Sequence, residues 1–324
     1  MRSSERSRRS RALSERAVDA RTGWFLSTWA AILWLTTSSA GAQPAHLRVM
    51  PDRMPSAIFK QMVTHDKLIG SPGLAWRQRA VTVAFKGGDD SLYALIESAA
   101  SEWTALGGEL QLSFRDDAGH FRHWTTEDVN PAADVRVSFD DVGDLAGYWS
   151  VVGVMAQNIA AKEPTMNLGG FIEALAPYLH GQNSTAWLAS YEHSVILHEF
   201  GHALGLSHEH FNPQCQADLK LSMVITSLME PPNGWSEEQA KFNMDAGYYF
   251  NVLADQAGPL DTHPVSSSST DRTSVMLYPF TDDFYQSGAA SPCKPAGALG
   301  YATTLSNGDR QFFLNNYAHI SSAN

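Results

Sequence analysis

One stretch organises this chain, residues 195 to 210: Val-Ile-Leu-His-Glu-Phe-Gly-His-Ala-Leu-Gly-Leu-Ser-His-Glu-His. His198 and His202 are four residues apart, so on a helix both imidazoles project from the same face, one turn apart. They can therefore bind one metal ion, with Glu199 beside it where a metal-bound water would lie. Gly205 can adopt positive φ at no steric cost and so end the helix. The chain can then turn and bring His208 back as a third ligand.

Three neutral imidazoles with one open coordination position are typical of a catalytic zinc site, because a structural site is closed by a fourth protein ligand, usually Cys. We therefore predict one Zn2+ per chain, bound by His198, His202 and His208, with Glu199 as a catalytic residue. A bare H-E-x-x-H is a weak signal. The added Gly and third His make a chance match rare, on the order of one in ten thousand for a chain of this size. The alternative is an amphipathic core helix whose histidines bond to the main chain.

A second motif, Ser-Val-Met-Leu-Tyr at residues 274 to 278, follows the first along the chain. Together the two motifs resemble the metzincin clan of zinc metallopeptidases, and Glu209 makes the chain most similar to astacins and their bacterial and fungal relatives. The resemblance implies that Met276 lies beneath the zinc site. It also implies that Tyr278 is a flexible metal ligand that moves to the reacting oxygen, although a packed core tyrosine is the alternative. Leu277 stands where astacins usually carry His, at a position that is not a ligand in the family.

The resemblance implies an α+β fold for a catalytic domain at residues 76–324. We expect a twisted mixed sheet with the active-site helix in an upper lobe, to about residue 208, and a mostly irregular lower lobe that ends in a helix. Residues 164–170 are predicted to form the edge strand of the sheet, to which an extended peptide can add. A loop is the alternative for this segment, because Pro and Gly flank it.

Periodicity and capping signals place further elements along the chain. Strands are predicted at 80–85, 110–114 and 135–139, and helices at 91–106, 172–178, 191–204, 236–243 and from 306 onward. The last two helices begin with capping boxes, Ser236 with Gln239 and Ser306 with Asp309. His210 is expected to face solvent, and Glu209 to pair with a basic group or the mature N-terminus.

The first 42 residues have the composition of a signal peptide: an arginine-rich start, a short apolar run at 24–36, and Ala-Gly-Ala at 40–42. The apolar run is too short for a comfortable membrane span, so we predict export. The long basic region leaves an uncleaved anchor or a misassigned start codon as alternatives. Residues 43–75 are predicted to form an extended segment or short pro-piece. Asp52 and Asp66 are candidates there for the aspartate with which an astacin propeptide can occupy the zinc.

The net charge argues against some classes of binding partner, and the cysteines bear on whether the protein contains a disulfide. The formal net charge is -11, which argues against a nucleic-acid or anionic-membrane partner. The chain has two cysteines, Cys215 and Cys293. In an exported protein this pair is expected to form a disulfide, which stabilises by roughly 4 kcal/mol through loop closure. Two buried free thiols are the alternative.

These features together predict a secreted zinc endopeptidase, a monomer that acts on protein or peptide substrates without stable membrane association after signal cleavage. Zinc lowers the pKa of its bound water from about 16 toward 7. Glu199 takes the proton and later delivers it to the leaving amine, and Tyr278 donates to the developing oxyanion. One alternative is a zinc-binding protein without catalysis, which would usually have lost the base that Glu199 supplies. The other is a zinc hydrolase that cleaves amides in cell-wall peptides.

Overall fold

A computed structural model describes residues 54–64, 73–180, 184–231, 233–257 and 269–320. The chain divides into two compact units, Met1–Gln43 and Pro44–Asn324, and all described residues belong to the second. The predicted signal peptide and the candidates Asp52 and Asp66 lie outside the described residues. None of the helices in the described ranges is long and apolar enough to cross a membrane.

A mixed sheet with the strand order β2-β1-β4-β6-β5 forms one layer of this unit, and the short strand β3 pairs with β1 off that path. Neighbouring strands run parallel except for β5, which is antiparallel to β6. The predicted α+β class is therefore confirmed. The strands span Ala80–Phe85 (β1), Gln111–Ser113 (β2), Arg122–His123 (β3), Val135–Ser138 (β4), Tyr148–Ser150 (β5) and Met166–Leu168 (β6).

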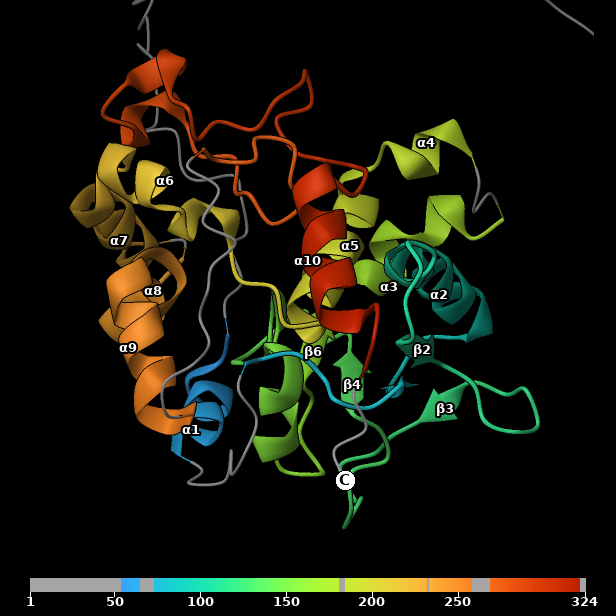
Figure 1. The fold of residues 1–324 in the computed structure, drawn as a ribbon. Coiled ribbons are helices and arrows are strands. Elements are labelled where there is room, and N and C mark those ends of the chain that lie inside the picture. Colours follow the sequence, from blue (N-terminus) through green and yellow to red (C-terminus); the bar gives the residue numbers. More distant parts are fainter. Residues whose placement is uncertain (1–53, 65–72, 181–183, 232, 258–268, 321–324) are drawn as a thin grey trace, which may run out of the picture. The chain divides into compact units, whose positions relative to one another are not determined.

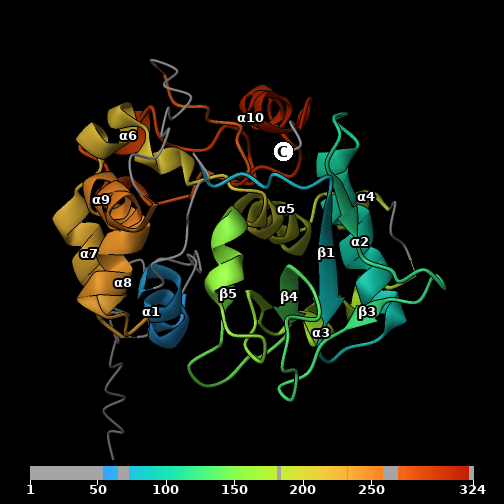
Figure 2. The ribbon, with the colours of Figure 1, turned by 60° about the horizontal axis from the view of Figure 1, so that its bottom comes forward.

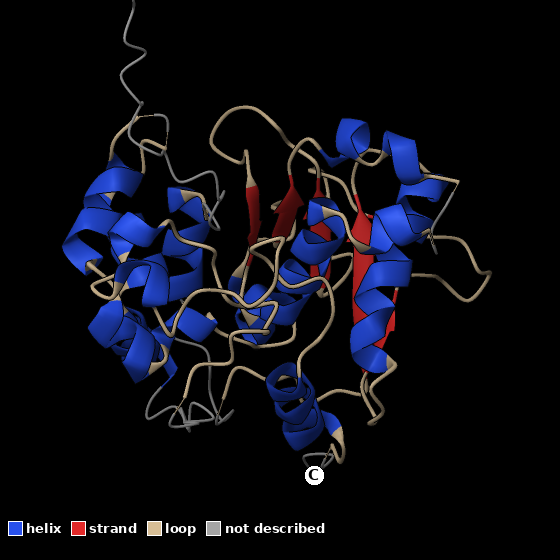
Figure 3. Ribbon diagram, turned by 90° about the horizontal axis from the view of Figure 1, so that it is seen from above, coloured by secondary structure: helices blue, strands red, loops and turns tan. Residues whose placement is uncertain are grey.

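Helices lie beside the strands of the sheet (Figure 3). Two long ones, α2 and α5, pack against each other and against the sheet. Trp103 of α2 donates its indole N–H to the carbonyl oxygen of Leu197 in α5, 3.0 Å away. Around the sheet the helices span Asp90–Thr104 (α2), Gly153–Asn158 (η1), Phe171–Ala174 (α3), Ala176–Tyr178 (η2), Thr185–Leu188 (α4), Tyr191–Ala203 (α5) and Asn307–Tyr317 (α10). Asp89 caps α2, while Ser306 and Asp309 form the predicted capping box of α10.

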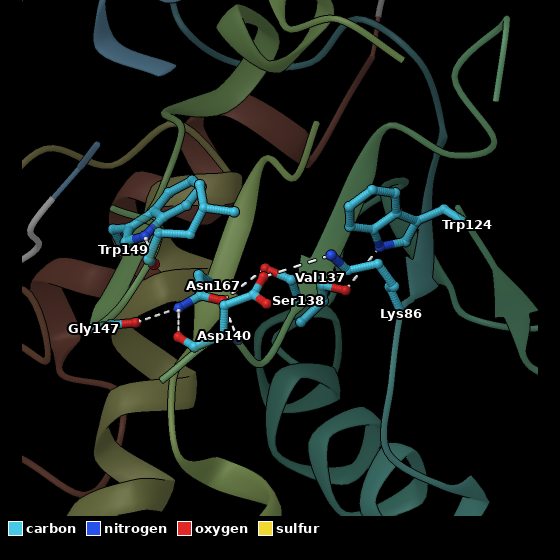
Figure 4. A network of polar contacts seen from close by, with 9 residues as sticks. Lys86, Trp124, Val137, Ser138, Asp140, Gly147, Trp149 and Asn167 are labelled. Atoms are coloured by element: carbon cyan, nitrogen blue, oxygen red, sulfur yellow. Dashed lines mark hydrogen bonds and ion pairs between the residues drawn. The ribbon is translucent and has the colours of Figure 1, made fainter. Parts of the chain in front are cut away.

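The prediction that residues 164–170 form the edge strand is wrong. Their strand, β6, lies between β4 and β5, and β5 is the edge. Asn167 explains why a loop-like sequence is tolerated inside a sheet (Figure 4). Its buried side-chain oxygen accepts from Ser138 Oγ at 2.6 Å and from the main-chain N–H of Asp140 at 2.9 Å. Its amide nitrogen donates to the carbonyl oxygens of Asp140 and Gly147, so every polar group of this side chain is bonded.

A helix also occupies part of the segment that was predicted to be extended. Residues Ser56–Thr64 form α1, which lies beside α8 and α9 (Figure 2) and contacts η1. Ile58, Phe59 and Met62 are buried in the main hydrophobic cluster, and the Phe59 ring meets Phe242 edge-on at 4.8 Å. Burial against distant elements stabilises this nine-residue helix, which is too short to be stable from local propensity alone.

The residues after His208 are more helical than predicted. A group of helices lies side by side apart from the sheet (Figure 1) and packs partly around a second hydrophobic cluster. They span Glu209–Phe211 (η3), Pro213–Asp218 (α6), Leu221–Met229 (α7), Glu237–Met244 (α8) and Ala246–Ala257 (α9), followed by Asp282–Phe284 (η4) and Gly288–Ala290 (η5). The capping box of Ser236 with Gln239 is confirmed at the start of α8.

The predicted disulfide is confirmed: Cys215 in α6 is bonded to Cys293, with a Cα–Cα distance of 5.3 Å and a sequence separation of 78. Replacing both cysteines by serine is expected to lower the free energy of unfolding by about 4 kcal/mol, because the unfolded chain regains the entropy of an open loop. Urea denaturation of both proteins under oxidising conditions measures this difference. Equal midpoints and slopes would show that the bond adds no stability.

Candidate metal centre

The helix α5 is fixed at both ends by polar contacts. Ser190 caps its start by accepting from the His193 N–H at 3.1 Å. At its end, the carbonyl oxygens of Ala203 and Leu204 accept from the Trp76 indole and the Tyr317 hydroxyl. The helix therefore lies in a defined position, with its terminal carbonyls bonded by side chains from distant segments. Gly205 then takes a φ of +96°, and the chain turns as predicted.

Three buried histidines come together at this turn, His198 and His202 from α5 and His208 from the segment after it. The Nε2 atom of His202 lies 3.1 Å from the Nε2 atoms of both His198 and His208. In a tetrahedral zinc site with Zn–N bonds of about 2.0–2.1 Å, neighbouring nitrogens are about 3.3 Å apart. The spacing of the three nitrogens is therefore consistent with a metal site.

The hydrogen bonds of these rings favour the same interpretation. The Nδ1 atom of His198 lies 2.7 Å from the carbonyl oxygen of Val275, and that of His202 lies 2.8 Å from the carbonyl oxygen of Leu206. A carbonyl can only accept, so Nδ1 carries the proton in both rings and the neutral ring directs the lone pair of Nε2 toward the other imidazoles. Lone pairs that face one another at this distance repel unless a cation lies between them. The residues thus fit a divalent metal ion such as Zn2+.

The predicted turn at residues 274–278 passes directly against α5. Gly201 allows this approach, because a Cβ atom there would lie 2.5 Å from the Met276 sulfur. The carbonyl oxygen of Met276 accepts from the Glu209 N–H at 2.9 Å, next to His208. Met276 therefore packs against α5 at Gly201 through its side chain, and its main chain bonds to the residue after His208.

Asp309 of α10 has a role that its capping signal does not reveal. Its carboxylate accepts from the Ser274 hydroxyl at 2.7 Å and from the Val275 N–H at 3.1 Å. Because the Val275 carbonyl in turn holds His198, the last helix of the chain orients a candidate metal ligand. Sequence reasoning identified Asp309 only as a capping residue, since a sequence separation of 34 from Val275 leaves no local signal of their contact.

The two predicted catalytic residues both lie at this cluster. Glu199 is 1% exposed and lines the same pocket as His198. The ring of Tyr278 lies 4.6 Å from the His208 ring and 5.4 Å from the His198 ring, centroid to centroid. Leu277, which stands where astacins usually carry His, also lines this pocket. The structure therefore brings together every site residue that the sequence predicts.

His210 differs from expectation, and its neighbour Glu209 has a partner that was not predicted. His210 does not face solvent: it is fully buried, and its Nε2 lies 2.8 Å from the Asn243 carbonyl oxygen. Glu209 accepts from the Asp271 N–H at 2.8 Å, and burial raises the pKa of its carboxyl group to about 7. His210 is thus covered by α8, whereas Glu209 bonds to the segment around Asp271.

The chain thus combines a mixed α+β fold with a buried three-histidine cluster. No family profile matches the sequence, and no curated protein matches it either. Among solved structures, myroilysin aligns with a TM-score of 0.53 and 24% identity over 76% of this chain and 96% of that one. This likeness establishes the fold.

Two further structures align less well. A second structure of myroilysin has a TM-score of 0.45 and 22% identity, over 84% of this chain and 99% of that one. High choriolytic enzyme 1, a hatching-enzyme zinc protease from Oryzias latipes (medaka fish), has a TM-score of 0.37 and 14% identity, over 72% of this chain and 87% of that one.

Replacing His208 by alanine is expected to weaken zinc binding at least 10-fold, because it removes one of three candidate ligands; even changes to the partners of ligands cost about 10–100-fold. Zinc content after dialysis, measured by elemental mass spectrometry, gives the result. His120→Ala is the matched control, since this histidine is exposed. One zinc per chain retained in both variants would remove His208 from the ligand set.

Proposed function

We propose that this chain is a zinc-dependent endopeptidase that hydrolyses extended proteins or peptides. The observation that carries the proposal is the convergence of three buried imidazole nitrogens beside a buried glutamate. His198 and Glu199 also line a pocket. His198, His202 and His208 would hold the ion. When bound, zinc supplies Lewis acidity, which acidifies a water molecule and polarises a carbonyl group.

Glu199 is the general base in this proposal. It follows His198 directly in α5, and its carboxylate is shielded from bulk water by the surrounding core. It takes a proton from the attacking water and passes it to the leaving amine nitrogen, as a positioned carboxylate can do. Its presence opposes the alternative of a zinc protein without catalysis, for which a buried carboxylate beside the ligands would have no use.

Tyr278 stabilises the transition state in this proposal. Its ring packs against His198, His208 and His210, which holds the phenol at the cluster. The hydroxyl group donates to the oxyanion that develops on the scissile carbonyl. Such a donor is worth about 3 kcal/mol in other enzymes.

The edge strand β5 supports an extended substrate. Gly147 and Val151 bond to the β6 side, through the Gly169 N–H and the Thr165 carbonyl oxygen. Main-chain groups alternate in direction along a strand, so those of Tyr148 and Ser150 point away from β6. A peptide can add at this side by main-chain bonds, which explains binding of many sequences. The strand that we propose for substrate binding is therefore β5 and not β6.

The proposed enzyme is exported from the cytoplasm. The signal-peptide composition of residues 1–42 and the disulfide between Cys215 and Cys293 both support export to an oxidising compartment. Residues 43–75 remain a candidate pro-segment. Apolar side chains of α1 are buried in the core. A cleavage before Met54 would keep them in place, whereas a cleavage after α1 would expose the core that they cover.

The test is hydrolysis of a denatured protein mixture by purified protein, with and without a zinc chelator. We expect chelation to stop cleavage and added zinc to restore it. Glu199→Ala, loaded with zinc, is the control for a contaminating protease. Cleavage that persists with chelator, or cleavage only of cell-wall peptide amides, would contradict the proposal.

A further inference from the structure

The side chain of Asn167 joins the two ends of the loop that leads into the edge strand β5. This loop, residues 139–147, connects β4 to β5. The amide nitrogen of Asn167 donates to the carbonyl oxygen of Asp140 at 2.8 Å and to that of Gly147 at 2.6 Å, one at each end of the loop (Figure 4). Its amide oxygen accepts from the Asp140 N–H and from the Ser138 hydroxyl. One side chain of β6 therefore ties both ends of the loop to the sheet.

The partners of this amide determine its orientation. The carbonyl oxygens of Asp140 and Gly147 can only accept, and the Asp140 N–H can only donate, so a flipped amide would place like groups against one another. Asn167 is fully buried, so the loss of a bond would leave a buried polar group without its partner. An aspartate has the same shape but, when ionised, no donor, so it would keep the contact with the Asp140 N–H and lose the two contacts with carbonyl oxygens.

The rest of the loop contributes little to its own placement. Its outer part is exposed, and Val142 is 77% exposed. The Trp149 indole N–H donates to the Leu145 carbonyl oxygen at 2.9 Å, but this bond joins the loop to the strand that follows it, so both can move together. The Gly147 carbonyl oxygen also accepts from the Gly169 N–H at 3.1 Å. The bonds at Gly147 therefore attach the end of the loop to the segment of β6.

The start of β5 is the part of this strand that a substrate can reach. Tyr148 is half-buried, whereas the other two residues of the strand are buried. Tyr148 also lines the pocket together with His198 and Glu199. Its main-chain groups point away from β6, so an added peptide would bond to the residue directly after Gly147. The position of Gly147 thus sets where such a peptide lies relative to the histidines.

The register of β5 needs support because the strand has only three residues. Register is weakly specified in a short ladder, and a slip of one residue would turn the Tyr148 side chain to the other face of the sheet, away from the pocket. In the observed register Asn167 lies opposite Trp149, and its amide reaches the Gly147 carbonyl oxygen. A slipped strand would present a different residue to this amide, so the bond favours the observed register.

We propose that Asn167 is a positioning residue: through Gly147 its amide fixes the register of β5, and with it the register in which an extended substrate bonds to that strand beside the candidate metal centre. The inference rests on the proposed endopeptidase function. It adds a residue that contacts neither the substrate nor the ion. Its effect depends on substrate length, because only an extended peptide uses β5.

The first experiment compares zinc-loaded wild-type protein with Asn167→Asp on an extended fluorogenic peptide and on a dipeptide amide that is too short to reach β5. We expect KM for the extended peptide to rise about 10-fold, the worth of one or two main-chain hydrogen bonds. Its kcat, and kcat/KM for the dipeptide amide, should stay unchanged. A merely structural role would reduce the amount of folded enzyme and so lower kcat for both substrates equally. That result, or an unchanged KM, would overturn the proposal.

A second variant disturbs the same junction without changing the amide. In Gly169→Ala the added Cβ would lie 2.7 Å from the Asp140 carbonyl oxygen and 2.9 Å from the Gly147 nitrogen, so the end of the loop must shift. This variant should raise KM for the extended peptide in the same way. The matched control is Asn158→Asp, a buried asparagine in η1 whose amide bonds to α1, and it should leave KM unchanged. Wild-type KM in folded, zinc-loaded Gly169→Ala would contradict the proposal.

A binding measurement separates this inference from the proposed function. Zinc-loaded Glu199→Ala, with and without Asn167→Asp, is titrated with extended peptides that carry one N-methyl group at successive residues, and fluorescence anisotropy gives the dissociation constants. Methylation at the residue that faces β5 should weaken binding about 10-fold in Glu199→Ala, because it removes a main-chain donor, and should have no such effect in the double variant.

The outcomes of the two measurements are distinguishable. Methylation that matters only when Asn167 is present, without any hydrolysis by the wild-type chain, would support the role of Asn167 while contradicting the peptidase. The same methylation pattern with and without Asn167→Asp, together with active wild-type protein, would contradict only the role of Asn167.

Discussion

Replacing Glu199 by alanine is expected to lower kcat for peptide hydrolysis on the order of 1,000-fold, while the chain keeps its fold and its zinc. General acid–base catalysis contributes about 100- to 10,000-fold in enzymes, and this residue is the carboxylate next to the candidate ligands. The three imidazoles that would hold the metal are untouched by the change. Stopped assays with a fluorogenic peptide measure kcat, and elemental analysis measures the bound zinc.

An exposed glutamate gives the matched control for this variant. Glu127→Ala removes a carboxylate of the same kind from a surface turn, and it should leave both kcat and zinc content unchanged. Circular dichroism of both variants checks that the helices remain. If Glu199→Ala turned over substrate at the wild-type rate, Glu199 would not be the base, and the proposed mechanism would be wrong.

Replacing Tyr278 by phenylalanine is expected to lower kcat and kcat/KM together by about 100-fold, with KM nearly unchanged. A donor that acts only on the transition state has this kinetic signature, and the loss of one oxyanion donor costs about 100- to 1,000-fold. The phenyl ring preserves the packing against His198 and His208, so thermal stability and zinc content should hold. Steady-state kinetics measure kcat and KM, and a thermal melt measures the stability.

The burial of Tyr278 supplies the competing explanation. This side chain is 4% exposed and belongs to the second hydrophobic cluster, so it also contributes to packing. If packing were its only role, activity would fall no more than stability falls. Wild-type kcat in a stable Tyr278→Phe chain with zinc bound would therefore remove the residue from the catalytic set.

Several features of the fold could be predicted because they depend on local geometry. The helix around His198 and His202 follows from a spacing of four residues, and the turn at Gly205 follows from its freedom to take positive φ. The capping boxes at Ser236 and Ser306 join groups three residues apart, so they too are present as expected.

Other features depend on contacts between distant residues, and these were missed or wrong. Strand order cannot be read from one strand, so β6 was placed at the edge although Asn167 bonds to neighbours on both sides. The helix α1 exists because Phe59 and Met62 find a partner surface on later helices. His210 is buried because helices more than 30 residues further along the chain cover it.

The candidate ligands His198, His202 and His208 and the candidate base Glu199 could be identified from sequence, since a helix and one glycine turn bring them together within a single short stretch. Their surroundings depend on contacts between distant segments. The Asp309 carboxylate reaches the Val275 main chain, and the Tyr278 ring meets His208, through packing of segments that lie far apart in sequence. Local periodicity sets the direction of a side chain along its own helix, whereas burial of apolar surface decides which distant segment it meets.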